Sequence, residues 1–158
     1  MKIAIYFSHS GHTKKVAEYI AGKLNCETIR LEEEKKRRGL VHFFVGGFKA
    51  VRGLEEKLLP FKDIGPYAEI FLGLPVWAGK TCPAVNFFIN HAPLEGKKVH
   101  VFFTLGGDDW QKAGEQIRSM LSAKGALPGA VSAFPNFREF NETCVRTADD
   151  FINTVSKG

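Results

Sequence analysis

Apolar runs and segments of helical periodicity alternate along this sequence, and this alternation constrains the fold more than any other feature. The apolar runs at 2–7, 68–74 and 97–105 are nearly continuous. Such strands are typical of a parallel sheet that helices cover on both faces. The predicted elements in chain order are strands near 2–7, 27–31, 68–74, 97–105 and 130–134, and helices near 16–24, 83–91, 113–121 and 142–155. We therefore predict one α/β domain spanning residues 1–158, with Asn141 as the N-cap of the last helix.

Length and composition are those of a soluble globular domain. The chain has 158 residues, 44% of them hydrophobic and 25% charged, which is enough to bury a full core. No apolar stretch reaches the ~18 residues of a membrane span, and no secretory signal is evident. The cysteines Cys26, Cys82 and Cys144 are odd in number and lack paired spacing, which argues against a disulfide framework. We expect a cytoplasmic protein.

The basic balance of the chain favours anionic partners, because the formal net charge is +5 and the pI about 9.2. The densest basic run, 35–38, directly follows three glutamates at 32–34, so the opposite charges nearly cancel. A nucleic-acid surface normally lacks such an acidic neighbour and interleaves stacking aromatics, so we expect no nucleic-acid binding. His9 and His12 lack a third ligand nearby, so we expect no metal site.

Polar, glycine-containing turns follow three of the predicted strands, at 8–13, 75–81 and 104–110. In an open parallel sheet, ligands bind outside the carboxyl ends of the strands, near a switch in strand order. We therefore place the candidate binding site at these three turns.

The first turn is rich in hydrogen-bond donors. It carries Ser8, His9, Ser10, Gly11, His12 and Thr13 directly before a helical pattern. A helix start supplies unpaired N–H groups and about half a positive charge, so this turn is suited to a phosphate. The alternative is a hydroxyl-rich helix cap with no ligand. The turn lacks the Gly-Lys-Ser/Thr ending of a Walker loop and the glycine triplet of a dinucleotide site, which favours a mononucleotide phosphate.

A resemblance to the flavodoxin family appears in the stretch SHSGHTKKVAEYIAGKL, because the family's phosphate loop reads Ser/Thr-x-Ser/Thr-Gly-x-Thr. Ser8, Ser10, Gly11 and Thr13 match that pattern, while His12 stands where the family often has asparagine.

Two later stretches strengthen the resemblance. The family's flavin-ring loop after the third strand is similar to GLPVWAGKTCPAVNFFI, and its glycine-containing loop after the fourth strand is similar to FFTLGGDDW. The three matches cover the chain except about residues 32–66. They imply a flavodoxin-like three-layer α/β/α sandwich with a five-stranded parallel sheet, strand order 2-1-3-4-5, that binds FMN non-covalently.

The resemblance places the flavin ring at the second and third turns. Trp77 and Trp110 are the chain's two tryptophans, one in each turn; either can stack on the ring or cap an edge of the core. In the family, a backbone peptide at Ala78 and Gly79 accepts a hydrogen bond from the reduced flavin N5, although Gly79 could equally serve only a tight turn. The other expected contacts are Pro75, Val76, Thr104, Leu105, Gly106 and Gly107.

Three further features have mainly structural interpretations. We expect Asp108 and Asp109 to cap the following helix. We expect Cys82 to be a small apolar residue at a helix start, with a regulatory thiol as the alternative. The aromatic-rich segment 32–66 departs from the family. We expect it to pack as a helix, with a dimer face or a wall above the flavin as alternatives.

Two functions agree with these features. An electron carrier would hold FMN with an exposed ring edge and meet a redox partner protein, and the positive charge of the chain would favour an acidic partner. The alternative is an NAD(P)H-dependent FMN or quinone oxidoreductase on the same fold, which needs an open flavin face. A third reading is a module that keeps the fold without the flavin. We favour the carrier because the sequence contains no convincing catalytic constellation.

Overall fold

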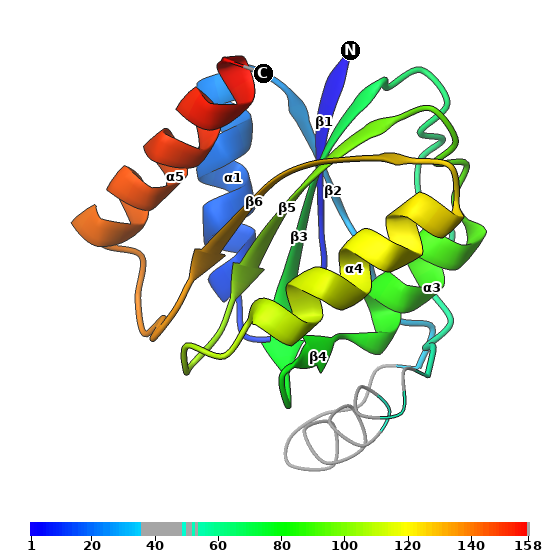
Figure 1. Ribbon diagram of the computed structural model, residues 1–158, viewed down its shortest axis with the longest axis horizontal. Coiled ribbons are helices and arrows are strands. Elements are labelled where there is room, and N and C mark those ends of the chain that lie inside the picture. The colour runs from blue at the N-terminus through cyan, green and yellow to red at the C-terminus, as the bar shows by residue number, and fades with distance from the viewer. Residues whose placement is uncertain (36–48, 50–51, 53, 158) are drawn as a thin grey trace.

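Five parallel strands form the centre of the computed structural model, which describes residues 1–35, 49, 52 and 54–157 (Figure 1). The strands are β1 Lys2–Tyr6, β2 Glu27–Arg30, β3 Glu69–Trp77, β5 Lys98–Thr104 and β6 Leu127–Phe134. They lie in the order β2-β1-β3-β5-β6, with parallel pairing throughout. Counted along the chain, this is the predicted order 2-1-3-4-5. The structure adds β4, Lys80–Thr81, which pairs antiparallel with the end of β3 and was not predicted.

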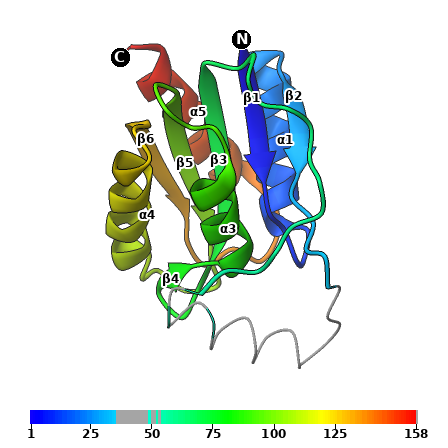
Figure 2. The same cartoon turned by 90° about the vertical axis from the view of Figure 1, so that its right-hand side faces the viewer.

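Helices cover both faces of the sheet, which confirms the predicted three-layer sandwich (Figures 1 and 2). One face carries α1, His12–Leu24, and α5, Glu142–Ser156; the other carries α3, Pro83–His91, and α4, Gln111–Ala123.

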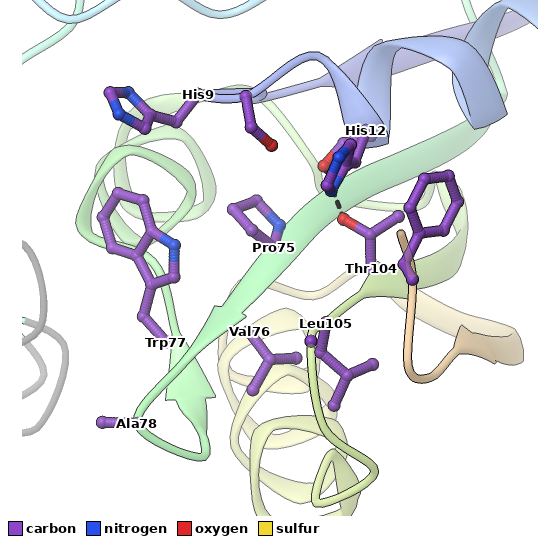
Figure 3. A pocket seen from close by; sticks show the side chains of 12 residues that line it. His9, His12, Pro75, Val76, Trp77, Ala78, Thr104 and Leu105 are labelled. Atoms are coloured by element: carbon purple, nitrogen blue, oxygen red, sulfur yellow. Dashed lines mark hydrogen bonds between the residues drawn. The ribbon is translucent and has the colours of Figure 1, made fainter. Parts of the chain in front are cut away.

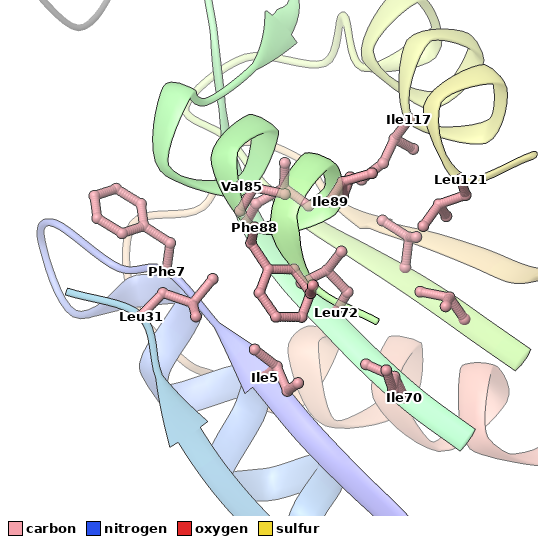
Figure 4. Close-up of a cluster of buried hydrophobic side chains, with 14 of the residues drawn as sticks. Ile5, Phe7, Leu31, Ile70, Leu72, Val85, Phe88, Ile89, Ile117 and Leu121 are labelled. Atoms are coloured by element: carbon pink, nitrogen blue, oxygen red, sulfur yellow. The ribbon is translucent and has the colours of Figure 1, made fainter. Parts of the chain in front are cut away.

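Side chains of β1 alternate between the two apolar layers because strand side chains point to opposite faces in turn. Ile3 and Ile5 belong to the cluster with Phe88 of α3, whereas Ala4 and Tyr6 belong to the cluster with α1 and α5. Figure 4 shows the first cluster, in which side chains of α3 and α4 lie over the sheet. Because both faces of the sheet are covered, its open ends are where a ligand can reach the strands.

Asn141 is the N-cap of α5, as predicted: its side-chain oxygen accepts a hydrogen bond from the Cys144 amide at 3.2 Å. The prediction for α4 was wrong. The N-cap residue is Trp110, and its side chain makes no capping hydrogen bond. The reason is that the turn extends one residue further, since the Trp110 amide bonds to the Asp108 carbonyl at 3.2 Å and Asp109 precedes the cap.

Much of segment 32–66 lies outside the described residues, so its predicted helix and the two alternatives stay predictions. Among its described parts, Glu33 and Leu58 form an antiparallel bridge with each other. Its contacts with the sandwich include the Phe61 ring, which packs against Phe88 with ring centroids 5.4 Å apart, and the Glu56 amide, which donates to the Pro83 carbonyl at 3.2 Å.

Within the described residues, no helix is long and apolar enough to cross a membrane, and no group of three potential metal ligands occurs. Cys26, Cys82 and Cys144 form no disulfide. Cys82 is completely buried, and burial raises the pKa of its thiol to about 12. The thiol therefore stays protonated and serves as a small apolar group.

Candidate functional site

A cavity of about 360 Å³ opens at the carboxyl ends of β1, β3 and β5 (Figure 3). Ligand sites typically measure about 300–1,000 Å³. All three predicted turns line it, together with a fourth segment that follows β6. The lining residues are His9, Ser10, His12 and Thr13 from the first turn, 75–78 from the second, 104–106 from the third, and Phe137.

The first turn forms a wall suited to an anion. Gly11 has a φ of 91°, and its amide donates to Ser8 Oγ at 3.1 Å, which closes the turn directly before α1. The first N–H groups of a helix have no intrahelical acceptor, so the amides of 12–14 are available to a ligand at the positive end of the helix dipole. The guanidinium of Arg30, on β2, donates to the Ser8 carbonyl at 3.3 Å and adds a positive charge beside this turn.

A hydroxyl pair joins the first turn to the third. Thr13 Oγ1 lies 2.7 Å from Thr104 Oγ1, and the two residues are 2% and 3% exposed. Both line the cavity, so this buried pair links the start of α1 to the end of β5 at the cavity wall (Figure 3).

The second turn is a β-hairpin between β3 and β4. Trp77 pairs with Lys80, and the two residues between them, Ala78 and Gly79, have φ values of 50° and 69°. Two consecutive positive φ values define the type I′ turn that favours tight hairpins. The Trp77 ring also makes an edge-to-face contact with Phe7, with ring centroids 5.9 Å apart and ring planes at 83°. The hairpin and this contact hold the Trp77 ring at the cavity wall.

Phe137 reaches the cavity through pairing between the loops that follow β5 and β6. The Phe137 amide donates to the Leu105 carbonyl at 2.9 Å, and the Asn136 amide donates to Gly107 at 2.8 Å. The Phe137 ring then packs against His12, with ring centroids 4.7 Å apart. The sequence analysis missed this residue. The signal was present, because the fifth strand ends at the same edge of the sheet as the other three.

Five predicted site residues do not line the cavity: Ser8, Gly11, Gly79, Gly107 and Trp110. Ser8 and Gly11 shape the first turn from behind. Gly79 faces away, since a Cβ there would lie 3.5 Å from the carboxylate of Asp109. Trp110 packs on Phe103 of β5, with ring centroids 6.1 Å apart. It therefore covers an edge of the hydrophobic core.

Comparison with known proteins gives a result at the level of structure. No family model matches the sequence, and no curated protein matches it either. A candidate flavoprotein from Bacteroides eggerthii superposes with a TM-score of 0.75 over 96% of this chain and 97% of that one, at 19% identity. A flavoprotein from Lactobacillus acidophilus, solved in complex with FMN, has a TM-score of 0.72 at 19% identity, covering 98% of this chain and 97% of that one.

A third structural match is oxidised flavodoxin 2 from Bacillus cereus, with a TM-score of 0.59, 19% identity and 99% of both chains covered. The fold is flavodoxin-like. The architecture implied by the three sequence motifs is thus confirmed, and the cavity occupies the carboxyl edge of that fold.

Proposed function

We propose that this protein binds FMN non-covalently in the cavity and carries electrons through it. One observation carries the proposal: a single cavity has a hydroxyl-bearing helix start on one wall and an aromatic hairpin on another. A ligand with a phosphate and a flat apolar ring matches both walls. In addition, the Lactobacillus acidophilus flavoprotein, whose fold this chain shares, is solved in complex with FMN.

The first turn would hold the phosphate. Amides of 12–14 and the Ser10 hydroxyl offer neutral donors, the helix dipole favours an anion, and Arg30 adds charge from β2. The amide donors belong to the backbone of a helix that is packed on the sheet, so little ordering of these groups is needed on binding.

The hairpin would hold the ring. The indole of Trp77 is aromatic, and Pro75, Val76 and Leu105 add apolar surface around it. When bound, FMN supplies a ring that accepts and releases electrons. The protein positions that ring and shields part of it from water.

The composition of the cavity wall favours a carrier over an oxidoreductase. Among the described residues that line the cavity, the titratable side chains are His9 and His12, both in the first turn, and none carries a carboxylate or a thiol. Electron transfer needs no general acid or base, whereas reduction of a quinone is completed by proton transfer. The net charge of +5 suits an acidic redox partner protein.

Titration of the purified protein with FMN by calorimetry tests binding, and stepwise dithionite reduction followed in the visible spectrum tests reversible reduction. Absence of binding would overturn the proposal. If the protein oxidises NADPH at steady state with a quinone as acceptor, it is an oxidoreductase rather than an electron carrier.

The two tryptophans provide a matched pair of variants. Trp77→Ala should weaken FMN binding about tenfold, because stacking on the ring is lost. Trp110→Ala should lower the melting temperature, because the contact with Phe103 is lost, but leave FMN affinity unchanged. Equal affinity losses in both variants would contradict the position that we propose for the ring.

A further inference from the structure

The two hydroxyl groups of Thr13 and Thr104 carry two hydrogens, but the hydrogen bond between them needs only one. Each hydroxyl carries one hydrogen and can accept as well as donate. A hydrogen bond between the two oxygens, 2.7 Å apart, uses one of these hydrogens. Among the described residues, neither hydroxyl has another hydrogen-bond partner.

The second hydrogen is therefore buried without an acceptor among the described residues, and both side chains line the cavity. Leaving a buried donor unsatisfied costs free energy, and buried polar groups are normally paired. The missing acceptor is thus expected in the cavity. Which hydroxyl presents the free hydrogen depends on the ligand, because a hydroxyl pair can run in either direction.

We infer that this pair is a relay that selects a phosphate ester over the corresponding neutral alcohol, an inference that rests on the proposed function. Thr13 lies in the first turn of α1, beside the amides that would bind the phosphate. A phosphate dianion only accepts hydrogen bonds, so it takes the hydrogen of Thr13. The oxygen of Thr13 then accepts the hydrogen of Thr104, and the donors run in one direction from Thr104 through Thr13 to the phosphate.

In this arrangement Thr104 is a positioning residue. Its hydroxyl polarises that of Thr13, and hydrogen bonds arranged in such a chain strengthen one another, most of all toward a charged acceptor. Riboflavin ends in a neutral hydroxyl, which can donate as well as accept and does not set the direction of the pair. Loss of the Thr104 hydroxyl should therefore weaken FMN binding more than riboflavin binding.

The test compares FMN and riboflavin affinities of the full chain by calorimetry, for the wild type and for Thr104→Val, which keeps the shape of the side chain and removes its hydroxyl. We expect FMN binding to weaken about five- to tenfold and riboflavin binding to change less than twofold. Thr104→Ser, which restores the hydroxyl, should bring the FMN-to-riboflavin ratio back to within about twofold of the wild type. If the Thr104→Val variant does not fold, the Thr104→Ala variant takes its place in the test.

Thr81→Val is the matched control. Thr81 is also completely buried, but its hydroxyl donates to Asn86 Oδ1 at 2.6 Å and does not line the cavity. This variant should leave the ratio of the two affinities unchanged even if it lowers stability.

A second comparison tests the direction of the relay. In a Thr13→Val background, removal of the Thr104 hydroxyl should have no further effect on FMN affinity, because the chain is already broken. An unchanged ratio in Thr104→Val, or equal losses for both ligands, would overturn the relay and leave FMN binding intact. Failure of the wild type to bind FMN would instead overturn the proposed function.

Discussion

Two buried polar clusters lie toward opposite ends of the sheet, and protein atoms complete only one of them. Toward the amino ends, His100 of β5 is almost fully buried; its Nε2 lies 2.9 Å from Glu69 Oε1, and its Nδ1 accepts the Ala130 amide at 3.0 Å. The ring stacks on Phe71, with centroids 5.0 Å apart. At the carboxyl ends, the hydroxyl pair and the first amides of α1 face a cavity.

The difference separates a structural cluster from a binding cluster. Because Nδ1 of His100 accepts a hydrogen bond, the proton of the neutral ring is on Nε2 and is donated to Glu69, so both nitrogens are used. The His100 ring therefore needs no ligand. The open end offers donors that find no acceptor in the described part of the chain, which is why we place the function there.

The largest effect is expected from crowding the closed cluster. A Cβ on Gly129 would collide with the His100 ring, which Glu69 and Ala130 hold in place. Gly129→Ala should therefore lower the free energy of unfolding by about 3 kcal/mol, measured by urea denaturation, with little change in FMN affinity. Gly22→Ala is the control: a Cβ there meets no atom, and alanine favours the helix by up to about 1 kcal/mol. A Gly129→Ala variant as stable as the wild type would contradict the closed packing.

A smaller effect is expected from acid. Burial lowers the pKa of His100 below its usual range, and this outweighs the opposing attraction of the Glu69 carboxylate, while Lys98 and Lys2 lower the pKa further. Below about pH 6.5, the unfolded chain therefore binds a proton that the folded chain does not, so stability is complete above that pH and falls as the pH drops. The slope cannot exceed about 1.4 kcal/mol per pH unit, so the loss between pH 7 and 5.5 is at most about 1.3 kcal/mol.

Urea denaturation across that pH range measures this dependence, and His100→Asn should flatten it because the side chain no longer titrates. His91→Gln is the control. His91 is exposed and contacts Glu55 at 3.1 Å, so its replacement should leave the slope in place. A slope that survives in His100→Asn would assign the dependence to other groups.

The sequence predicted local features of both ends well. Continuous apolar strands indicated a parallel sheet and its carboxyl edge, whereas the strand order came from the resemblance to flavodoxins. Asn141 was recognised as a cap because capping acts over three residues. Eleven of the cavity's lining residues lie in the three turns that were singled out.

Features that depend on contacts between distant segments were missed. Phe137 reaches the cavity only because its amide pairs with Leu105, and the Thr13–Thr104 pair joins residues 91 positions apart. Trp110 shows a related limit, because a strand-end pattern does not tell whether a side chain turns into the cavity or onto Phe103. β4 was missed since two residues are too few for a periodic pattern.

The smallest effect concerns the charge beside the open cluster. Arg30 is exposed on β2 and touches the first turn through the Ser8 carbonyl, not through the cavity, so it would act on a phosphate mainly through its field. Arg30→Gln should weaken FMN binding about two- to fourfold at low salt, and the loss should shrink toward zero near 1 M salt, where the screening length is about 3 Å. Riboflavin has no phosphate, so its affinity should not change.

Calorimetric titrations at several salt concentrations measure the Arg30 effect, with Arg146→Gln as the control. Arg146 is exposed on α5, and its guanidinium nitrogen lies 3.6 Å from Glu142 Oε2. Because Arg146 does not line the cavity, its replacement should alter FMN affinity little. A loss in Arg30→Gln that persists at high salt and extends to riboflavin would mean that Arg30 acts through the shape of the turn. In that case only the start of α1 would provide positive potential for a phosphate at the open end. The two ends of the sheet would then differ in unsatisfied hydrogen bonds rather than in charge.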